Sequence, residues 1–85
     1  MNINASSVWD NCLSFIKDNI QPQAFKTWFL PIKPVKLNGN VLSIEVPSKF
    51  FYEWLEEHYV KLLKTALYKE LGDEARLIYS IRMEN

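Results

Sequence analysis

Few side chains in this sequence could act as a catalytic base or nucleophile. The chain has one histidine, His58, and one cysteine, Cys12. A nucleophilic site needs a base beside the hydroxyl or thiol that it activates, and the sequence places no serine or cysteine to pair with His58. Because His58 falls on the apolar stripe of a predicted helix, a structural histidine in the core or at its edge is favoured over a catalytic one.

Carboxylates and glycines give no stronger sign of catalysis. Glu53, Glu56 and Glu57 cluster on the polar side of one predicted helix, which favours a solvated surface over acid–base chemistry. Neither GxxxxGK[ST] nor GxGxxG occurs, and Gly39 and Gly72 are placed as a turn and a helix stop. No residues show metal-ligand spacing. We therefore expect no enzymatic activity and no metal site in this chain.

Length and composition predict one small, neutral domain. The 85 residues are 48% hydrophobic and include three Trp, five Phe and four Tyr, which suffice for one core. Ten Lys and Arg balance ten Asp and Glu, so the chain lacks the positive field that drives strong nucleic-acid binding. The lone cysteine cannot form an internal disulfide, which fits a reducing compartment. The sequence shows no signal-peptide pattern and no apolar run near the ~18 residues that a membrane span needs. We therefore expect a cytoplasmic domain without membrane contact.

The elements that would position these side chains follow the order ααββαβ. A helix is predicted over residues 6–19 with Ser7 as its cap, and a short second helix begins at Pro22. Asn38-Gly39 predicts a hairpin between two strands, the first of which alternates Val35 and Leu37 around a lysine.

The rest of the chain predicts one long helix and a third strand. The helix runs from the cap Ser48 to the stop Gly72. Its core stripe is predicted to be Phe51, Trp54, Leu55, His58, Leu62 and Ala66. The strand alternates Leu77, Tyr79, Ile81 and Met83 inward. The pattern predicts an α+β domain over residues 6–83, with a three-stranded sheet packed against helices, a disordered N-terminus at 1–5 and a linker starting at 84–85.

Two aromatic residues exceed what this core needs. Trp9 lies in the first turn of a helix whose apolar positions spread over roughly 160°, wider than the usual ~100° stripe. It either completes the core or docks onto a partner. Phe50 lies about 115° from the midline of the long helix's stripe, so it either packs onto the preceding loop or is an exposed anchor.

The order and spacing of several motifs resemble the N-terminal domain (domain I) of the bacterial replication initiator DnaA. The pattern comprises W-x-x-C-L from Trp9, F-x-x-W-F-x-P-I from Phe25, a hairpin, P-S-K-F from Pro47 and W-L-x-x-H-Y from Trp54. It covers roughly residues 8–81. The resemblance implies a KH-like fold. It also implies a longer protein in which ATP and Mg bind a separate AAA+ module and a helix-turn-helix domain binds the origin, with no cofactor in this domain.

The resemblance implies a protein–protein interaction module that acts in replication initiation. Such a module would form weak homodimers, recruit the replicative helicase DnaB and receive regulators. The self-association residues would be Trp9, Val8 and Leu13, which favours the docking interpretation of Trp9. The helicase and regulator surface would comprise Phe50, Lys49, Gln23, Ala24 and Lys26. Some members carry an acidic residue at the position of Ala24, so that polar contact is in doubt here although the surface is not.

The KH-like fold raises an alternative function, weak binding of single-stranded DNA. The GxxG loop that clamps the backbone in KH domains is missing, because the sequence LNGNV is a hairpin turn. Lys33, Lys36 and Lys49 could still line a weak single-strand surface near the hairpin. A solubilising role for these lysines is favoured.

Overall fold

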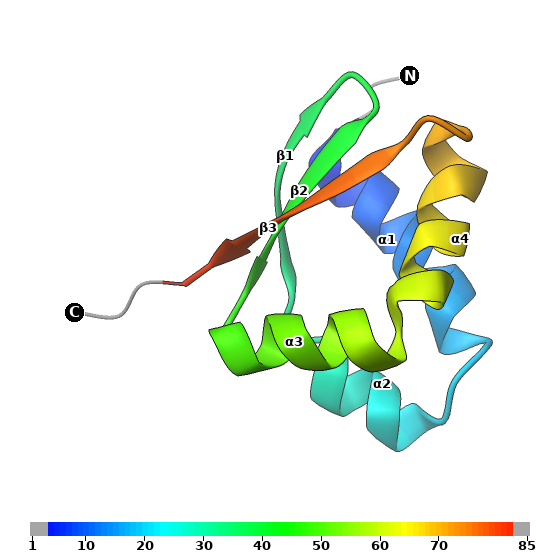
Figure 1. Ribbon diagram of the computed structural model, residues 1–85. Coiled ribbons are helices and arrows are strands. Elements are labelled where there is room, and N and C mark those ends of the chain that lie inside the picture. The colour runs from blue at the N-terminus through cyan, green and yellow to red at the C-terminus, as the bar shows by residue number, and fades with distance from the viewer. Residues whose placement is uncertain (1–3, 83–85) are drawn as a thin grey trace.

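The computed structural model describes residues 4–82 and forms two layers, a sheet and a set of helices (Figure 1). The elements are α1 (Ala5–Lys17), α2 (Pro22–Trp28), β1 (Lys33–Asn38), β2 (Val41–Val46), α3 (Lys49–His58), α4 (Val60–Leu71) and β3 (Arg76–Ile81). The predicted α+β class is confirmed. In this part of the chain no helix has both the length and the apolar character to cross a membrane.

Helix α1 begins slightly earlier than predicted. Its N-cap is Asn4, whose side chain accepts a hydrogen bond from the Ser7 amide at 2.9 Å, while the Asn4 amide donates to Ser7 Oγ at 3.1 Å. Ser7 is therefore the capping-box partner and not the cap, since asparagine is at least as good a cap as serine. Asn4 and Ala5 thus belong to the fold. Residues 1–3 of the predicted disordered segment, Met83 and the predicted linker lie outside the described residues.

The sheet has the order β1-β2-β3, with β2 in the centre. β1 and β2 are antiparallel and joined at Gly39, whose φ of 64° suits the predicted hairpin turn. β3 runs parallel to β2 after the chain has crossed through α3 and α4. Strand β2 alternates cleanly, because Leu42, Ile44 and Val46 are fully buried while the residues between them are partly exposed.

The helices cover the face of the sheet onto which these three residues point (Figure 1). α1 packs against both α4 and β1. The core cluster that results consists of Val8, Trp9, Cys12, Ile16, Phe29, Ile32, Leu42, Ile44, Val46, Leu55, Leu63, Ala66, Leu67 and Ala75. Every helix except α2 therefore contributes at least one buried residue, and α2 contributes through Phe29 at its C-cap.

Strand β1 departs from the predicted alternation at Val35. The pairing register steps from Pro34↔Ile44 to Lys36↔Ser43, which leaves Val35 as an extra residue in a β-bulge. A bulge changes the side on which the following residues point. Consequently Val35 is 56% exposed, and the prediction that it alternates with Leu37 on one face is wrong.

The predicted long helix is divided at Tyr59. This residue has φ −127° and ψ 8°, outside the helical region, and it ends α3 and precedes α4. Its ring packs edge-on against Phe29 at 5.2 Å between centroids. The sequence has no glycine or proline here, so only this packing marks the break. The division lets α3 lie across α2 while α4 turns to pack on α1 (Figure 1).

Helix α4 ends at Gly72, as predicted. The glycine has φ 94° and ψ 175°, a conformation that essentially only glycine adopts. The chain then turns through Ala75, which is buried, into β3.

Candidate functional site

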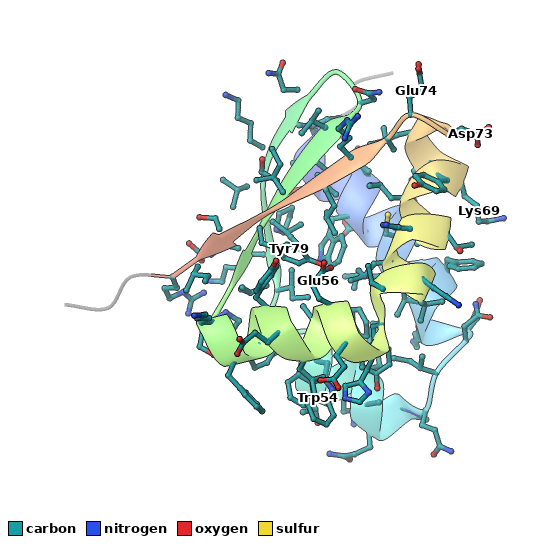
Figure 2. The ribbon with its side chains drawn as sticks, in the orientation of Figure 1. Trp54, Glu56, Lys69, Asp73, Glu74 and Tyr79 are labelled. Atoms are coloured by element: carbon teal, nitrogen blue, oxygen red, sulfur yellow. The ribbon has the colours of Figure 1, made fainter. Side chains whose placement is uncertain are left out.

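Helices α2 and α3 bring together an aromatic surface, formed by Trp28, Phe50, Phe51, Trp54 and His58. The Trp28 and Trp54 rings are stacked at 4.8 Å with an interplanar angle of 11°. Phe51 lies 4.9 Å from Trp28, and His58 lies 4.1 Å from Trp54. Figure 2 shows Trp54 on the side of α3 that faces α2. The stacked pair therefore joins α2 to α3 through two residues that are twenty-six positions apart in the sequence.

Phe50 is the most exposed large hydrophobic residue of the described chain. Its side chain is 60% exposed, although its ring lies 6.0 Å from Trp28 and 6.1 Å from Trp54. Its position follows from the start of α3, where the Ser48 side chain caps the helix by accepting from the Phe51 amide at 3.3 Å. The Phe50 ring is therefore exposed and rests on the stacked tryptophans, and its role as an anchor for a partner stays a prediction.

Three members of the aromatic surface, Phe51, Trp54 and His58, are predicted from sequence to lie in the core. Phe51 is partly buried and packs against the core cluster. Trp54 is only partly buried, and His58 is exposed and stacked on Trp54, so neither belongs to the core stripe of α3. The buried residue of that helix is Leu55. The regular spacing of Phe50, Trp54 and His58, four residues apart, places them on one side of a helix and could have identified this surface from sequence.

Trp9 and Val8 lie in the core and not on a surface. Trp9 is 2% exposed and Val8 is 3% exposed, whereas Leu13 on the same helix is partly buried. A partner gains nothing by covering a ring that the domain has already removed from water. The docking interpretation of the Trp9 ring is therefore corrected to a core role in this fold. Whether α1 mediates self-association stays a prediction.

The other residues of the predicted partner surface lie on α2 and at the start of α3. Lys49, beside Phe50, is exposed, and so are Gln23 and Lys26 on α2, while Ala24 is partly buried. No aromatic contact or hydrogen bond within residues 4–82 joins these α2 positions to Phe50. Instead Trp28, at the end of α2, makes the link. Lys26 lines a separate hollow of about 410 Å³ beside Phe25 and Leu30.

The three lysines of the alternative DNA surface are all exposed but come from two places. Lys33 and Lys36 lie on β1, opposite Glu45 and Ser43 of β2. Lys49 begins α3. Glu45 is engaged by Arg82, whose guanidinium Nη2 lies 3.1 Å from its carboxylate. The face of the sheet away from the helices thus carries several cations and one paired carboxylate.

The potential catalytic groups are placed for structural roles. Cys12 is buried, and burial, with a smaller effect from Glu70, raises the pKa of its thiol to about 12. The thiol therefore remains protonated and is a poor nucleophile. Glu56 accepts a hydrogen bond from the Tyr79 hydroxyl at 2.9 Å. Burial and this carboxylate raise the pKa of Tyr79, so its hydroxyl stays a donor. Between residues 4 and 82 there is no group of three or more potential metal ligands.

Comparison with known proteins agrees with the motifs that carry the resemblance. The family "DnaA N-terminal domain" matches residues 6–69. The chromosomal replication initiator protein DnaA of Flavobacterium psychrophilum is 75% identical over all 85 residues, which span 18% of that protein. The proteins of the same name from Chlorobaculum tepidum and Bacteroides fragilis are 56% and 44% identical over 91% of this chain, and the chain spans 16% of each. The chain belongs to the DnaA N-terminal domain family.

Proposed function

We propose that this chain is a protein–protein interaction module of a replication initiator and acts when chromosomal replication begins. Its relatives are named chromosomal replication initiator proteins, and the chain spans under a fifth of their length. The single observation that carries the proposal is the aromatic surface with Phe50 60% exposed at its edge. Other apolar residues are also exposed, but Phe50 is in contact with two further rings, Trp28 and Trp54, and contiguous apolar surface of this kind marks interaction sites.

The arrangement of the rings suits a binding hot spot. Phe50 stands on Trp28 and Trp54, which are already stacked and therefore lose little conformational freedom when a partner binds. Aromatic anchors of this type contribute about 2 kcal/mol or more to binding when a partner buries them. Lys49 adds a charge at the edge, where it can orient a partner that carries a carboxylate.

The partners that we propose are the replicative helicase and proteins that regulate initiation. We also retain weak self-association through α1, which would become effective when several initiators are held side by side on origin DNA. Since Trp9 and Val8 are buried, this contact would have to use the partly exposed Leu13 and the exposed residues around it.

Substitution of Phe50 tests the main proposal. We expect Phe50→Ala to weaken binding of this chain to the replicative helicase of the same organism by about thirtyfold, which corresponds to about 2 kcal/mol. Val35→Ala is the matched control, because Val35 is a large apolar residue of nearly the same exposure (56%) but lies on β1, outside the aromatic surface. Calorimetric titration measures both. Equal affinity of parent and Phe50→Ala, with the fold intact by circular dichroism, would show that the aromatic surface is not the docking site.

A second candidate, weak single-stranded DNA binding, has support from the exposed cations of β1. If Lys33, Lys36 and Lys49 contact phosphates, the logarithm of the binding constant should fall with the logarithm of salt with a slope of about −2. Titration of a labelled oligothymidine at three salt concentrations measures this slope. Binding that is undetectable at low salt, or unchanged in the triple Lys→Ala variant, would remove this candidate.

A further inference from the structure

Strand β3 has an edge that no other strand covers. The sheet order ends at β3, so one side of its backbone faces away from β2. The Arg76 amide donates to Asn40 and the Arg82 amide donates to Val46, both toward β2. Because alternate residues of a strand direct their backbone groups to opposite sides, Leu77, Tyr79 and Ile81 present their N–H and C=O groups to the open edge.

A groove runs between this edge and the helices. Its volume is about 250 Å³. The residues that line it are Glu56, Val60, Leu63, Lys64, Leu67, Tyr68, Ala75, Arg76, Leu77 and Tyr79. In Figure 2, Glu56 leaves α3 toward Tyr79, on the opposite side of the helix from Trp54. The groove and the aromatic surface are therefore separate sites.

The size and lining of the groove favour a side chain as its occupant. Pockets that enclose small-molecule ligands usually have ~300–1,000 Å³, and this groove is smaller. Leu63 and Leu67 form an apolar wall, and the Glu56–Tyr79 hydrogen bond closes one end. An extended chain on the edge of β3 would send alternate side chains to the same face as Leu77 and Tyr79, which is the face of the groove.

Charge distinguishes between a second copy of the chain and another partner. If two β3 strands paired antiparallel about Tyr79, Arg76 of each copy would lie opposite Arg82 of the other, and like charges directly opposite are destabilising. The groove itself carries Lys64 and Arg76 against a single carboxylate, Glu56, which the Tyr79 hydroxyl already engages. Arg82 is already paired with Glu45 at 3.1 Å, so the cation that a strand with acidic side chains would chiefly neutralise is Arg76.

We propose that the edge of β3 and the groove along α4 bind an extended acidic peptide segment of a partner protein by β-strand addition. The segment forms backbone hydrogen bonds with Leu77, Tyr79 and Ile81. Its apolar residues enter the groove between β3 and α4. Its acidic residues at either end lie opposite Arg76 and Arg82, on the face of the sheet away from the helices. This site is additional to the aromatic surface, and its failure would leave the proposed function unaffected.

A matched pair of peptides tests the proposal. The probe is Glu-Val-Thr-Val-Ser-Val-Glu with blocked ends, and the control is the same peptide with lysine at both ends. We expect the acidic peptide to bind the 85-residue chain, to shift the amide NMR signals of Leu77, Tyr79 and Ile81, and to slow their hydrogen exchange. The lysine peptide should bind at least about fivefold more weakly. Absence of binding by the acidic peptide at millimolar concentration, or equal binding of both, would overturn the proposal.

Two variant pairs locate the site. Arg76→Glu should weaken the acidic peptide about threefold to tenfold, because Arg76 lies opposite a terminal glutamate. Lys36→Glu, exposed on the same face of the sheet but on β1, should have little effect. Ile81→Pro removes an outward amide at an edge position that tolerates proline, and should weaken binding more than Ile81→Ala does. Equal effects within each pair would overturn the proposal, and the charge-reversal pair decides the outcome if the proline variant fails to fold.

Two competing occupants are identified by the same spectra. Protection of the β3 amides that rises with protein concentration without peptide would show that a second copy occupies the edge. Protection by an oligothymidine, with no effect of the acidic peptide, would show that a nucleic acid occupies it. Either result would overturn the assignment to an acidic peptide.

Discussion

The two ends of the helical layer use tryptophan in different ways. Where α1 meets α4, Trp9 is 2% exposed and belongs to the core. Where α2 meets α3, Trp28 and Trp54 stack on each other near the surface and support the exposed ring of Phe50. The same side chain contributes to folding in the first region and is available for recognition in the second. The difference is set by how much of each ring remains in contact with water, because only that area can be buried by a partner.

The largest expected effect is that of Trp9→Ala, which removes a core ring. Replacement of a buried Trp by Ala typically costs about 3–5 kcal/mol, from lost burial and the cavity left behind. Since native proteins have only about 5–15 kcal/mol of stability, the variant should lose from about a fifth to nearly all of it. Urea denaturation followed by circular dichroism measures the free energy of unfolding. A cost below about 1 kcal/mol, together with loss of self-association, would restore the docking interpretation of Trp9.

Cysteine labelling compares the two regions in one assay. In the folded chain, Cys12 should react with a thiol reagent at least on the order of 100-fold more slowly than in urea, because it is buried and its thiol stays protonated. A thiol introduced as Phe50→Cys in a Cys12→Ala background should react at nearly the same rate in both conditions. Fast labelling of Cys12 in the folded chain would show that the α1–α4 region opens readily.

The raised pKa of Cys12 also predicts how stability depends on pH. The folded-state pKa is about 12 and the ordinary value is 9.0, so the unfolded chain loses the thiol proton first. The contribution of this residue is therefore fully present below pH 9 and is lost as pH rises from 9 toward 12. The difference in unfolding free energy between parent and Cys12→Ala, measured across this range, isolates the effect from lysine titration. A difference that stays constant from pH 8 to 11 would contradict it.

Gly72→Ala tests the turn that seats α4 against α1. The glycine has φ 94° and ψ 175°, and an added Cβ would meet no atom within 4 Å, so the expected cost of about 1–3 kcal/mol comes from backbone strain alone. Chemical denaturation measures the loss, and Lys61→Ala, exposed on α4, is the control for a surface change. A neutral Gly72→Ala would show that this end of the domain tolerates another conformation, which would weaken the contrast between the two regions.

The smallest expected effect on stability is that of Phe50→Ala. Because the ring is 60% exposed, its removal should lower the free energy of unfolding by less than about 1 kcal/mol, although it should abolish most partner binding. The same urea titration used for Trp9→Ala gives a direct comparison. A loss above 2 kcal/mol would show that Phe50 is part of the folding core and that the two regions do not differ as described.

Local patterns predicted most of the elements correctly. The Asn38-Gly39 hairpin, the start of α2 at Pro22 and the end of α4 at Gly72 all follow from residues with strong conformational preferences. The alternation of β2 also appears as predicted, with Leu42, Ile44 and Val46 buried. These features depend on a few neighbouring residues, so the sequence contains the information in one place.

The predictions from sequence fail where contacts between distant segments determine the local structure. Tyr59 breaks the predicted long helix because its ring packs on Phe29, thirty residues earlier by number. Val35 is extruded in a bulge because β1 must match β2 on both sides of it. Trp54 was assigned to the core because helical spacing cannot reveal that α2 would supply Trp28 as its stacking partner. The break at Tyr59 and the bulge at Val35 have no signal within their own helix or strand. The spacing of Phe50, Trp54 and His58 does mark a shared face of α3, but it does not show that Trp28 would pack there.

The sequence alone determined the class of the domain, its turns and caps, the absence of a recognisable catalytic motif and, through its spaced motifs, its family. These properties reside in residue types and short spacings. Only the tertiary structure decided that Trp9 is buried, that Phe50 is exposed on a pair of stacked tryptophans, and that β3 leaves an open edge beside α4. Burial is a property of the assembled domain, since the water-accessible area of a side chain depends on which distant segments come to cover it.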